Sequence, residues 1–600
     1  MANIKSAPKR SEVDPKYTWA TEDLFATDEL WFKELEALSE MPDRVAAFKG
    51  KLTESAKNLL GYFTLMDEVG LRLSRLANYA MRKSDEDTAN SFYRDMVGKM
   101  MSLDVRIDSA DAFSVPELLT LDEAKLASFI AEEPKLAVYE RYIKKVLRRK
   151  EHTLSDAEEA ILAAAGEISG TPGDIGSVFR NADLKFPSVK DSSGKEYPVT
   201  QGTFVPLLEM PDTELRKAAF KSMYDTFASY KNTTAAFLNG QVKQLMFFAK
   251  ARKYANTMEA SLDRTEVPVS VYHNLIKAVN DNMEYLHRYV ALRKKLMGVD
   301  ELHMYDIYMP IVEGDQKTVT FDEAKAACLE GLSVLGEDYL DMLREGFNNR
   351  WIDVYENEGK RSGAYSAGGD PHPYVLLNYH DTLDNQFTLA HEMGHALHSY
   401  LSRKHQPPIN SHYVIFVAEV ASTCNEVLLM RHLLSKTTDK RERATLINYF
   451  MEQFRTTLYR QTMFAEFEML MNSMAEKGDS LTADALCKVY YDLNCKYYGK
   501  DMVVDPEIAY EWARIPHFFY NFYVFQYATG FSAAVAIANR ILTEGRPAVE
   551  DYIRFLSSGG SQDPISLLKI AGVDMTTAKP VEDALKLFGE LIDEMEALMK

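Results

Sequence analysis

A five-residue pattern, His391-Glu392-Met-Gly-His395, carries the strongest chemical signal in the chain. On a helix, two histidines four residues apart project from one face, so both imidazoles can hold the same zinc ion. The surrounding window, residues 387–400, is helical rather than strand-like in composition. Glu392 follows the first histidine, where its carboxylate could take a proton from a metal-bound water. The pattern favours metal chemistry over a helix with two packed histidines.

A third ligand is expected, because catalytic zinc usually has three protein ligands and one open position. His398 shares the helix face, but it lies about 10.5 Å along the axis from His391, too far for one ion. A packing or outer-sphere role is therefore favoured for His398. The apolar, helix-compatible stretch 413–426 carries two carboxylates, Glu419 and Glu426. Because a carboxylate in such a helix needs a charge or a metal, Glu419 is the predicted ligand and Glu426 would orient a ligand histidine. A surface-facing Glu419 is the alternative.

At this point the chain resembles a known family, the M3 zinc metallopeptidases, and within it the bacterial oligoendopeptidase F group. The matching segments are Gly363-Ala-Tyr-Ser366, Tyr374-Val-Leu-Leu-Asn-Tyr379, the His391–His395 helix, Phe416-Val-Ala-Glu-Val-Ala-Ser422 and Arg514-Ile-Pro-His-Phe-Phe-Tyr520. Among these segments taken one at a time, only the zinc motif is specific for the family. All of them together, in this order and spacing, are highly specific for it.

The resemblance assigns roles to individual residues. It implies one zinc ion per chain on His391, His395 and Glu419, with Glu392 as the catalytic base. It also implies substrate and transition-state contacts by three further residues, His517, Tyr520 and Tyr527.

The same resemblance implies a fold and an activity. The expected fold is mainly α, a helical zincin with a small β-sheet at the active site and two halves around a deep substrate channel. The expected activity is hydrolysis of internal bonds in short, unstructured oligopeptides. A related carboxydipeptidase is one alternative; the 416–422 and 514–520 segments and the lack of an evident signal peptide argue against it. A catalytically dead peptide-binding protein is the other, and the intact Glu392 argues against that.

Two further segments bear on the site. Residues 359–373 are rich in Gly and Pro, and strand-like residues follow them. Such a strand is either an edge for an extended peptide or a core strand, and the residues alone leave both open. The resemblance favours contacts to the substrate backbone by Tyr374, Val375, Leu376, Leu377, Asn378 and Tyr379.

The second segment, residues 517–530, is dense in aromatic side chains. Four of them are expected in the core: Phe518, Phe519, Phe522 and Phe525. The polar tips of His517, Tyr520 and Tyr527 need partners when buried. Tyr520 and Tyr527 are two helical turns apart, so a helix would let both hydroxyls face one cavity.

The composition of the chain limits its possible partners and its location. With 600 residues, 46% of them apolar, the chain can bury a large core. Its 69 basic and 89 acidic residues give a net charge of −20, which disfavours nucleic acid as a partner. No apolar run is long enough for a membrane span. The four cysteines show no framework spacing, so reduced thiols in a cytoplasmic enzyme are expected.

Changes in periodicity suggest two regions. Helical periodicity runs from Asp28 to about Gly166, and residues 167–204 interrupt it. A β-hairpin is expected near 184–200. We therefore expect an N-terminal helical region, 1–205, and a catalytic region, 206–600.

Overall fold

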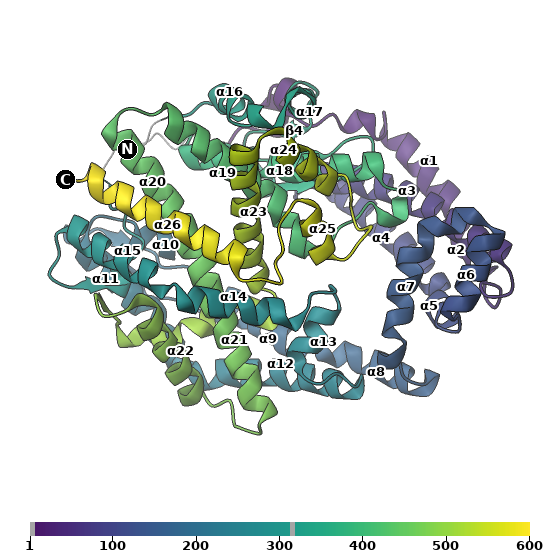
Figure 1. Cartoon of the computed structure of the whole chain (residues 1–600), viewed down its shortest axis with the longest axis horizontal. Coiled ribbons are helices and arrows are strands. Elements are labelled where there is room, and N and C mark those ends of the chain that lie inside the picture. Colours follow the sequence, from purple (N-terminus) through teal and green to yellow (C-terminus); the bar gives the residue numbers. More distant parts are fainter. Residues whose placement is uncertain (1–6, 313–317) are drawn as a thin grey trace. The chain divides into compact units, whose positions relative to one another are not determined.

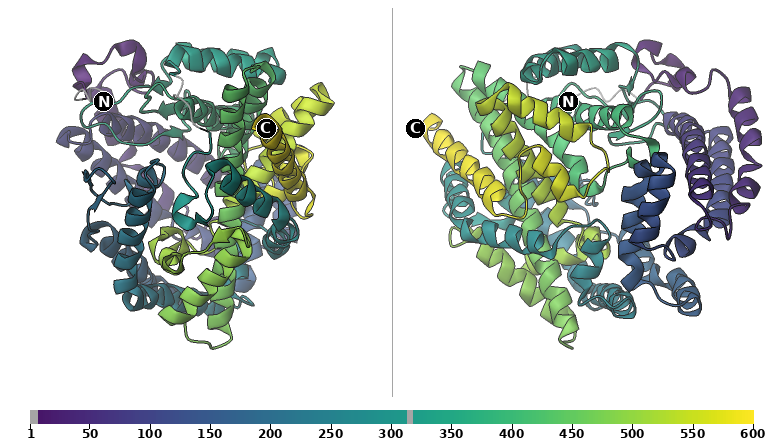
Figure 2. Two further views of the ribbon diagram at one scale, coloured as in Figure 1. Left: turned by 90° about the vertical axis from the view of Figure 1, so that its left-hand side faces the viewer. Right: turned by 45° about the vertical axis from the view of Figure 1, so that its right-hand side comes forward.

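The computed structural model describes residues 7–312 and 318–600, and helices make up most of them (Figures 1 and 2). The chain forms two compact units that are interleaved along the sequence. The first combines residues 1–151, 316–432 and 537–572; the second combines 152–315, 433–536 and 573–600. The predicted mainly α fold is confirmed. The expected boundary at residue 205 falls inside the second unit, because each unit draws on three separate stretches of chain. The channel between two halves stays a prediction.

The first unit begins with helices that alternate with short turns. They are α1 (Asp28–Leu38), α2 (Met41–Ala46), α3 (Ala56–Glu86), α4 (Ser91–Asp111), α5 (Ser114–Leu118), α6 (Glu123–Glu132) and α7 (Glu140–Arg148). The longest, α3, starts where the Ser55 hydroxyl accepts a hydrogen bond from the Asn58 N–H, a typical N-cap. Trp31 and Leu76 belong to a buried cluster that also includes Tyr374 of the sheet. The N-terminal helices therefore support the sheet from one side.

A three-stranded sheet follows the helices α16 (Phe321–Gly331) and α17 (Glu337–Asn348). Its strands are β4 (Ile352–Asp353), β5 (Tyr365–Ala367) and β6 (Tyr374–Leu376), in the order β4-β6-β5. β4 pairs with β6 in parallel, whereas β5 pairs with β6 antiparallel. The strand expected from the sequence is present, and β5 lies inside the segment expected to be loop.

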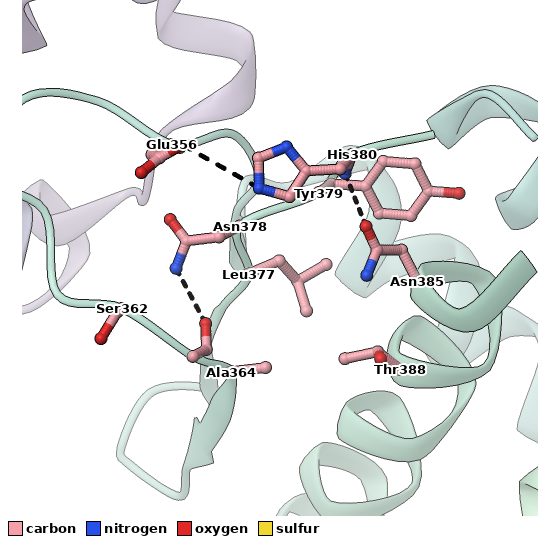
Figure 3. A pocket seen from close by; sticks show the side chains of 10 residues that line it. Glu356, Ser362, Ala364, Leu377, Asn378, Tyr379, His380, Asn385 and Thr388 are labelled. Carbon is pink, nitrogen blue, oxygen red and sulfur yellow. Dashed lines mark hydrogen bonds and ion pairs between the residues drawn. The ribbon is translucent and has the colours of Figure 1, made fainter. Parts of the chain in front are cut away.

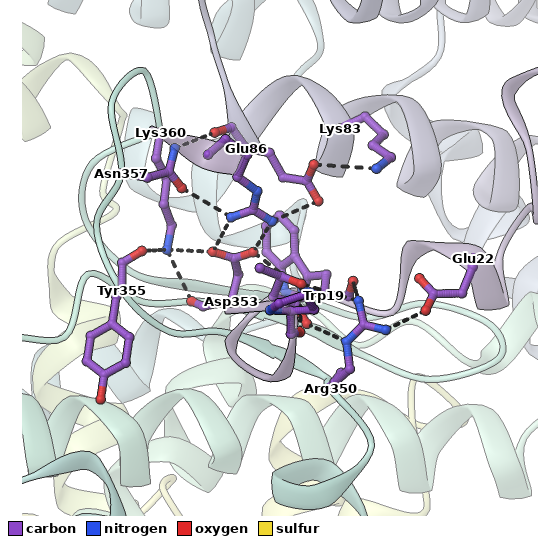
Figure 4. Close-up of polar contacts among 12 residues, drawn as sticks. Trp19, Glu22, Lys83, Glu86, Arg350, Asp353, Tyr355, Asn357 and Lys360 are labelled. Carbon is purple, nitrogen blue, oxygen red and sulfur yellow. Dashed lines mark hydrogen bonds and ion pairs between the residues drawn. The ribbon is translucent and has the colours of Figure 1, made fainter. Parts of the chain in front are cut away.

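A buried network of charges fixes this sheet to the N-terminal segment (Figure 4). The Arg10 guanidinium binds both carboxylate oxygens of Asp353, at 3.0 and 2.5 Å, and lies 3.0 Å from Glu86. The Lys360 ammonium, on a fully buried side chain, lies 2.8 Å from Oδ1 of the same Asp353 carboxylate. It also donates to the carbonyl oxygens of Tyr355 and Leu377, at 2.7 and 2.6 Å. Because these buried charges are paired, the network holds β4 and the end of β6 in one geometry.

Helices also dominate the second unit. They include α8 (Asp156–Ser169), α9 (Thr171–Val178), α10 (Phe204–Leu208), α11 (Thr213–Ser229), α12 (Lys231–Ala251), α13 (Thr257–Asp263), α14 (Val269–Asp281), α15 (Met283–Met297), α20 (Lys440–Gln453), α21 (Arg460–Glu476), α22 (Ala483–Tyr498) and α26 (Lys579–Leu598). Two small pairs of strands complete the unit. β1 (Val189–Lys190) and β2 (Glu196–Tyr197) form the predicted hairpin, and β3 (Leu302–His303) pairs in parallel with β7 (Met502–Val503).

One expected interruption is not seen. Residues 171–178, placed by the sequence in a broken region, form helix α9. Pro172 occupies the first turn of α9. Backbone N–H groups in the first turn make no hydrogen bond within the helix, so the missing N–H of proline costs nothing there. Among the described residues, no helix is both long and apolar enough to cross a membrane. All four cysteines are unpaired.

Candidate metal centre and active site

Helix α18 (Leu383–His405) presents the two candidate histidine ligands. The Thr382 hydroxyl caps its start by accepting a hydrogen bond from the Asn385 N–H at 3.1 Å. From there the helix runs without a break through His391 and His395. Their Nε2 atoms face each other 3.2 Å apart. Both side chains remain partly exposed, so a metal or a substrate can reach them.

Helix α19 (Ile415–Lys436) supplies the third candidate ligand. The Glu419 Oε2 atom lies 3.4 Å from Nε2 of His391 and 3.6 Å from Nε2 of His395. Three donors held about 2 Å from one tetrahedral ion are separated by about 3.3 Å, so the observed triangle fits zinc. Glu419 is 30% exposed, less buried than expected from its apolar helix. Hydrogen bonds with both imidazoles, acting against burial, hold the pKa of Glu419 well below its usual range.

Gly394 allows the two helices to approach so closely. A Cβ atom at this position would lie 2.5 Å from the Ser422 Cα and 2.8 Å from the Ala421 carbonyl oxygen. Asn425 ties the same helices together, because its side-chain amide donates to the Ala390 carbonyl at 3.1 Å. The glycine between Glu392 and His395 is therefore a packing requirement for bringing Glu419 close to the two histidines.

Glu392 lies on the same helix turn as the ligands. Its side chain is buried, with 7% of the residue exposed. The buried Oε2 atom has no hydrogen-bond partner among the described residues. Burial raises the pKa of this carboxyl, although the neighbouring histidines oppose the shift. Its Oε2 atom is therefore a buried acceptor beside the two histidines that no other described residue satisfies.

Two further residues lie near the candidate metal-binding group but are not part of it. Oε1 of Glu426 lies 2.5 Å from Nδ1 of His391, the nitrogen that points away from the metal position. This contact fixes the ring so that Nε2 faces His395 and Glu419. His398 is instead stacked on the Tyr413 ring, with ring centres 3.7 Å apart, and it is absent from the group of three that could share an ion. Burial lowers the pKa of His398 to about 3, so this histidine is neutral.

The sheet beside the helix differs from the expected edge. β6, expected to offer its backbone to a peptide, is the central strand: it pairs with β5 over Tyr374–Leu376 and with β4 over Val375–Leu376. The edge interpretation of these residues is therefore wrong, because their backbone groups already serve β4 and β5. β5 has no second strand partner among the described residues. It contacts α18 directly, so the free edge of the sheet runs beside the helix that carries the two candidate histidine ligands.

A cavity of about 390 Å³ opens where this sheet meets α18 (Figure 3). Its lining combines the end of the β6 segment, the residues before β5 and the first turns of α18. The lining residues are Glu356, Ser362, Gly363, Ala364, Leu377, Asn378, Tyr379, His380, Asn385 and Thr388. Asn378 holds two walls together by donating to the Gly363 carbonyl oxygen at 2.8 Å. Leu377, Asn378 and Tyr379 thus line a cavity beside the free edge.

The predicted transition-state residues belong to the second unit. Tyr520 does not share a helix with Tyr527, because α23 starts at Phe525 (Phe525–Glu544). The expected helical spacing between the two tyrosines is therefore wrong. The rings of Tyr520 and Tyr527 instead both meet the His517 ring edge to face, with centre distances of 5.5 and 6.0 Å. Burial lowers the pKa of His517, so its imidazole is uncharged at neutral pH.

Sequence reasoning missed a fourth member of this cluster. Tyr523 stacks against His517 at 6.2 Å and packs against Tyr520 at 6.1 Å and Tyr527 at 5.4 Å. Its polar tip among phenylalanines was the available signal. Of the predicted core residues, Phe518, Phe522 and Phe525 are buried, and Phe519 is half-buried beneath the Arg180 guanidinium.

A helix-borne pair of histidines with a glutamate between them, joined by a glutamate from the next helix, defines a mainly α metallopeptidase. The chain belongs to peptidase family M3. The model of Peptidase family M3 matches residues 206–587, and that of Oligopeptidase F matches residues 117–186. The predicted family and enzyme class, a metalloendopeptidase of the oligoendopeptidase F group, are confirmed. The family implies a metal cofactor.

Relatives match over nearly the whole chain. Oligopeptidase PepF of Bacillus subtilis is 49% identical, over 100% of this chain and 90% of the relative. Group B oligopeptidase PepB of Streptococcus agalactiae is 41% identical, over 98% of each. The crystal structure of oligoendopeptidase-F from Enterococcus faecium is 38% identical with a TM-score of 0.74, covering 95% of this chain and 99% of that one.

Proposed function

We propose that the chain is a zinc-dependent oligopeptidase that hydrolyses internal bonds of short, unstructured peptides. The observation that carries the proposal is the triangle formed by His391, His395 and Glu419, with the unpartnered Glu392 carboxylate beside it. Two imidazole nitrogens and one carboxylate oxygen are the donor set of many catalytic zinc sites. When bound there, zinc would lower the pKa of a water to about 7 and polarise a scissile carbonyl.

The protein's own groups then move the proton. Glu392 accepts it from the attacking water on its free Oε2 atom, and later passes it to the nitrogen of the departing amine. Glu426 keeps His391 oriented by holding Nδ1. No side chain needs to form a covalent bond with the substrate.

The tetrahedral intermediate carries a new negative charge on oxygen. We assign its stabilisation to hydrogen-bond donors of the His517, Tyr520 and Tyr527 cluster, to which Tyr523 is added by its ring contacts. A donor of this kind typically contributes about 10²- to 10³-fold in rate. Several neighbouring donors can share the role.

Substrate alignment is assigned to β5 instead of β6. An extended peptide could add to the unpaired side of Tyr365–Ala367 by backbone hydrogen bonds, in β-augmentation. The substrate contacts predicted for Tyr374, Val375 and Leu376 are replaced by a supporting role, because these residues are buried and their strand is paired with β5. Leu377, Asn378 and Tyr379 are proposed to receive a substrate side chain in the cavity that they line (Figure 3).

The proposed substrate class and location have separate support. The names of the relatives describe oligopeptidases, which supports oligopeptides as substrates here. The four unpaired cysteines support a reducing compartment, so a cytoplasmic location is proposed.

Product mapping on an octapeptide with both ends blocked tests the activity. An endopeptidase cuts this peptide, whereas the rival carboxydipeptidase needs a free carboxyl end and leaves it intact. Glu392→Gln is the matched control: it keeps the shape of the side chain but cannot accept the water's proton, so kcat should fall about 10²- to 10⁴-fold with metal content unchanged. Cleavage of only the free-ended peptide would favour the carboxydipeptidase, and a fully active Glu392→Gln would remove the proposed base.

A further inference from the structure

The segment between His517 and Tyr527 contains an unusual turn. Asn521 and Phe522, after the 3-10 helix Pro516–Phe519 and before α23, have φ angles of +53° and +59°. Left-handed backbone is uncommon outside glycine, and for a bulky residue such as phenylalanine it marks a turn held by its surroundings. The turn directs Tyr520 on one side and Tyr523 on the other to the same histidine.

A buried carboxyl group from α21 holds this turn. The Phe522 backbone N–H donates a hydrogen bond to Oε1 of Glu468 at 2.6 Å. Glu468 is 1% exposed, and its Oε2 atom has no hydrogen-bond partner among the described residues. Burial, opposed only by the Phe522 N–H, raises the pKa of Glu468 to about 8. Near neutral pH the group is therefore largely an uncharged acid, and among the described residues its carboxyl hydrogen-bonds only to the turn.

Two further residues hold the turn, one from α12 and one from α14. The side-chain amide of Gln241, on α12, donates to Oδ1 of Asn521 at 2.9 Å and to the Phe519 carbonyl at 3.3 Å. The Phe522 ring meets the Tyr272 ring of α14 edge to face, with centres 5.6 Å apart. Backbone, side chain and ring are therefore each held by a different helix.

Glu466, on the same helix, differs from Glu468 because its carboxylate joins helices. Glu466, two residues before Glu468, is also buried. Its oxygens lie 2.6 Å from the Lys496 ammonium and 2.9 Å from the Tyr497 hydroxyl. These contacts join helices and do not involve the turn. Glu468 has no such cation beside it. Burying a carboxyl group that gains only one hydrogen bond, from a backbone N–H, costs free energy. This cost indicates that the hydrogen bond to the Phe522 N–H has a role in holding the turn.

We propose that Glu468, assisted by Gln241, is a positioning residue that fixes the Asn521–Phe522 turn and thereby aims His517, Tyr520 and Tyr523 at the substrate. This inference rests on the proposed role of the aromatic cluster in stabilising the transition state. It assigns no chemistry to Glu468 itself, because the carboxyl acts through the backbone of Phe522.

The test compares Glu468→Ala with Glu468→Gln. The amide oxygen of glutamine can still accept the Phe522 N–H, and glutamine matches the uncharged acid, so Glu468→Gln should stay within about twofold of wild-type kcat. Alanine leaves the N–H unpaired, so kcat should fall about tenfold or more while KM changes little, as expected for misplaced transition-state donors. Hydrogen exchange over residues 519–527 should speed up in Glu468→Ala and remain slow in Glu468→Gln.

Two controls separate positioning from stability. Glu466→Gln disturbs the same helix and should lower the unfolding temperature without changing kcat or exchange in the turn. Gln241→Ala removes the second contact and should lower kcat in the same direction, so the test does not depend on Glu468→Ala folding well. Wild-type kcat and slow exchange in both Glu468→Ala and Gln241→Ala would overturn the proposal.

Failure of the underlying function looks different. If His517→Ala, Tyr520→Phe, Tyr523→Phe and Tyr527→Phe are all kinetically silent, the cluster does not stabilise the transition state. The exchange measurement would still report whether Glu468 holds the turn.

Discussion

Single atoms decide the proposed roles on the α18 helix. Nε2 of His391 and of His395 point at one position, and Oε2 of Glu392 is left without a partner beside it. The imidazole of His398 is three residues further along but stacks on Tyr413. The three histidines of this helix therefore have different proposed roles because their contacts differ: His391 and His395 are proposed ligands, and His398 is a packing residue.

This division predicts the metal content of two variants. Glu419→Ala removes one corner of the ligand triangle and should bind zinc at least about tenfold more weakly. His398→Ala removes a buried, stacked ring and should lower thermal stability while retaining one zinc per chain. Metal analysis of the purified proteins after dialysis checks both. Full zinc in Glu419→Ala together with none in His398→Ala would reverse the assignment.

Sequence alone could predict the ligands and not the turn. The spacing of His391 and His395 and the lone carboxylates of an apolar stretch pointed to the ligand group that the structure brings together. Tyr523 was missed because its place depends on the left-handed backbone of Asn521 and Phe522. That conformation is imposed by Glu468 and Gln241, which are distant in sequence, so no local pattern contains it.

At the scale of elements, short strands and 3-10 segments are placed by buried polar groups. Lys360 and Asp353 do this for the sheet. Glu511, in the 3-10 segment Pro506–Arg514, does it in the second unit. Its carboxylate lies 2.7 Å from Arg460 of α21, and it accepts hydrogen bonds from the hydroxyls of Tyr490 and Tyr224 at 2.6 and 3.0 Å.

This arrangement predicts acid sensitivity. Pairing with Arg460 and Arg514, acting against burial, lowers the pKa of Glu511 to about 2 in the folded protein. An unfolded glutamate titrates near 4.5. The stabilisation is therefore complete above about pH 4.5 and is lost as the pH falls towards 2, by up to about 3 kcal/mol.

Urea unfolding at a series of pH values between about 3 and 6 checks the prediction. Glu511→Gln should flatten the acid side of the profile. Glu507→Gln, which removes a partly exposed pair with Lys221, serves as the matched control and should change it much less. Equal profiles for wild type and Glu511→Gln would contradict the assigned role.

Strand order could not be predicted at this scale. The strand-like composition of Tyr374–Tyr379 identified β6, yet its central place depends on pairing with two other short strands. β5 has three residues among glycines and prolines, too few for a period-two pattern. The free edge of the sheet was therefore assigned to the wrong strand.

For the molecule as a whole, the interleaved units have a consequence for the proposed reaction. The proposed metal ligands belong to the first unit, and the His517 cluster belongs to the second. Under the proposed function, residues from both must act on the same peptide bond. A flexible chain can adapt to such a requirement, whereas a folded protein must first unfold locally, at a cost of several kcal/mol.

We therefore predict a ceiling on substrate form: unstructured oligopeptides are cut, and stably folded proteins are not. The test is a nested series of peptides lengthened from about 6 to about 40 residues around one cleavage site, with a stable folded protein carrying that site as the end point. We expect kcat/KM to fall along the series and cleavage of the folded protein to be undetectable. The same protein, unfolded by reduction or by a destabilising substitution, serves as the control and should be cut more readily than its folded form. A constant kcat/KM across all lengths, or equal rates for the folded and unfolded forms, would mean that substrate access to the metal-ligand residues does not limit the reaction.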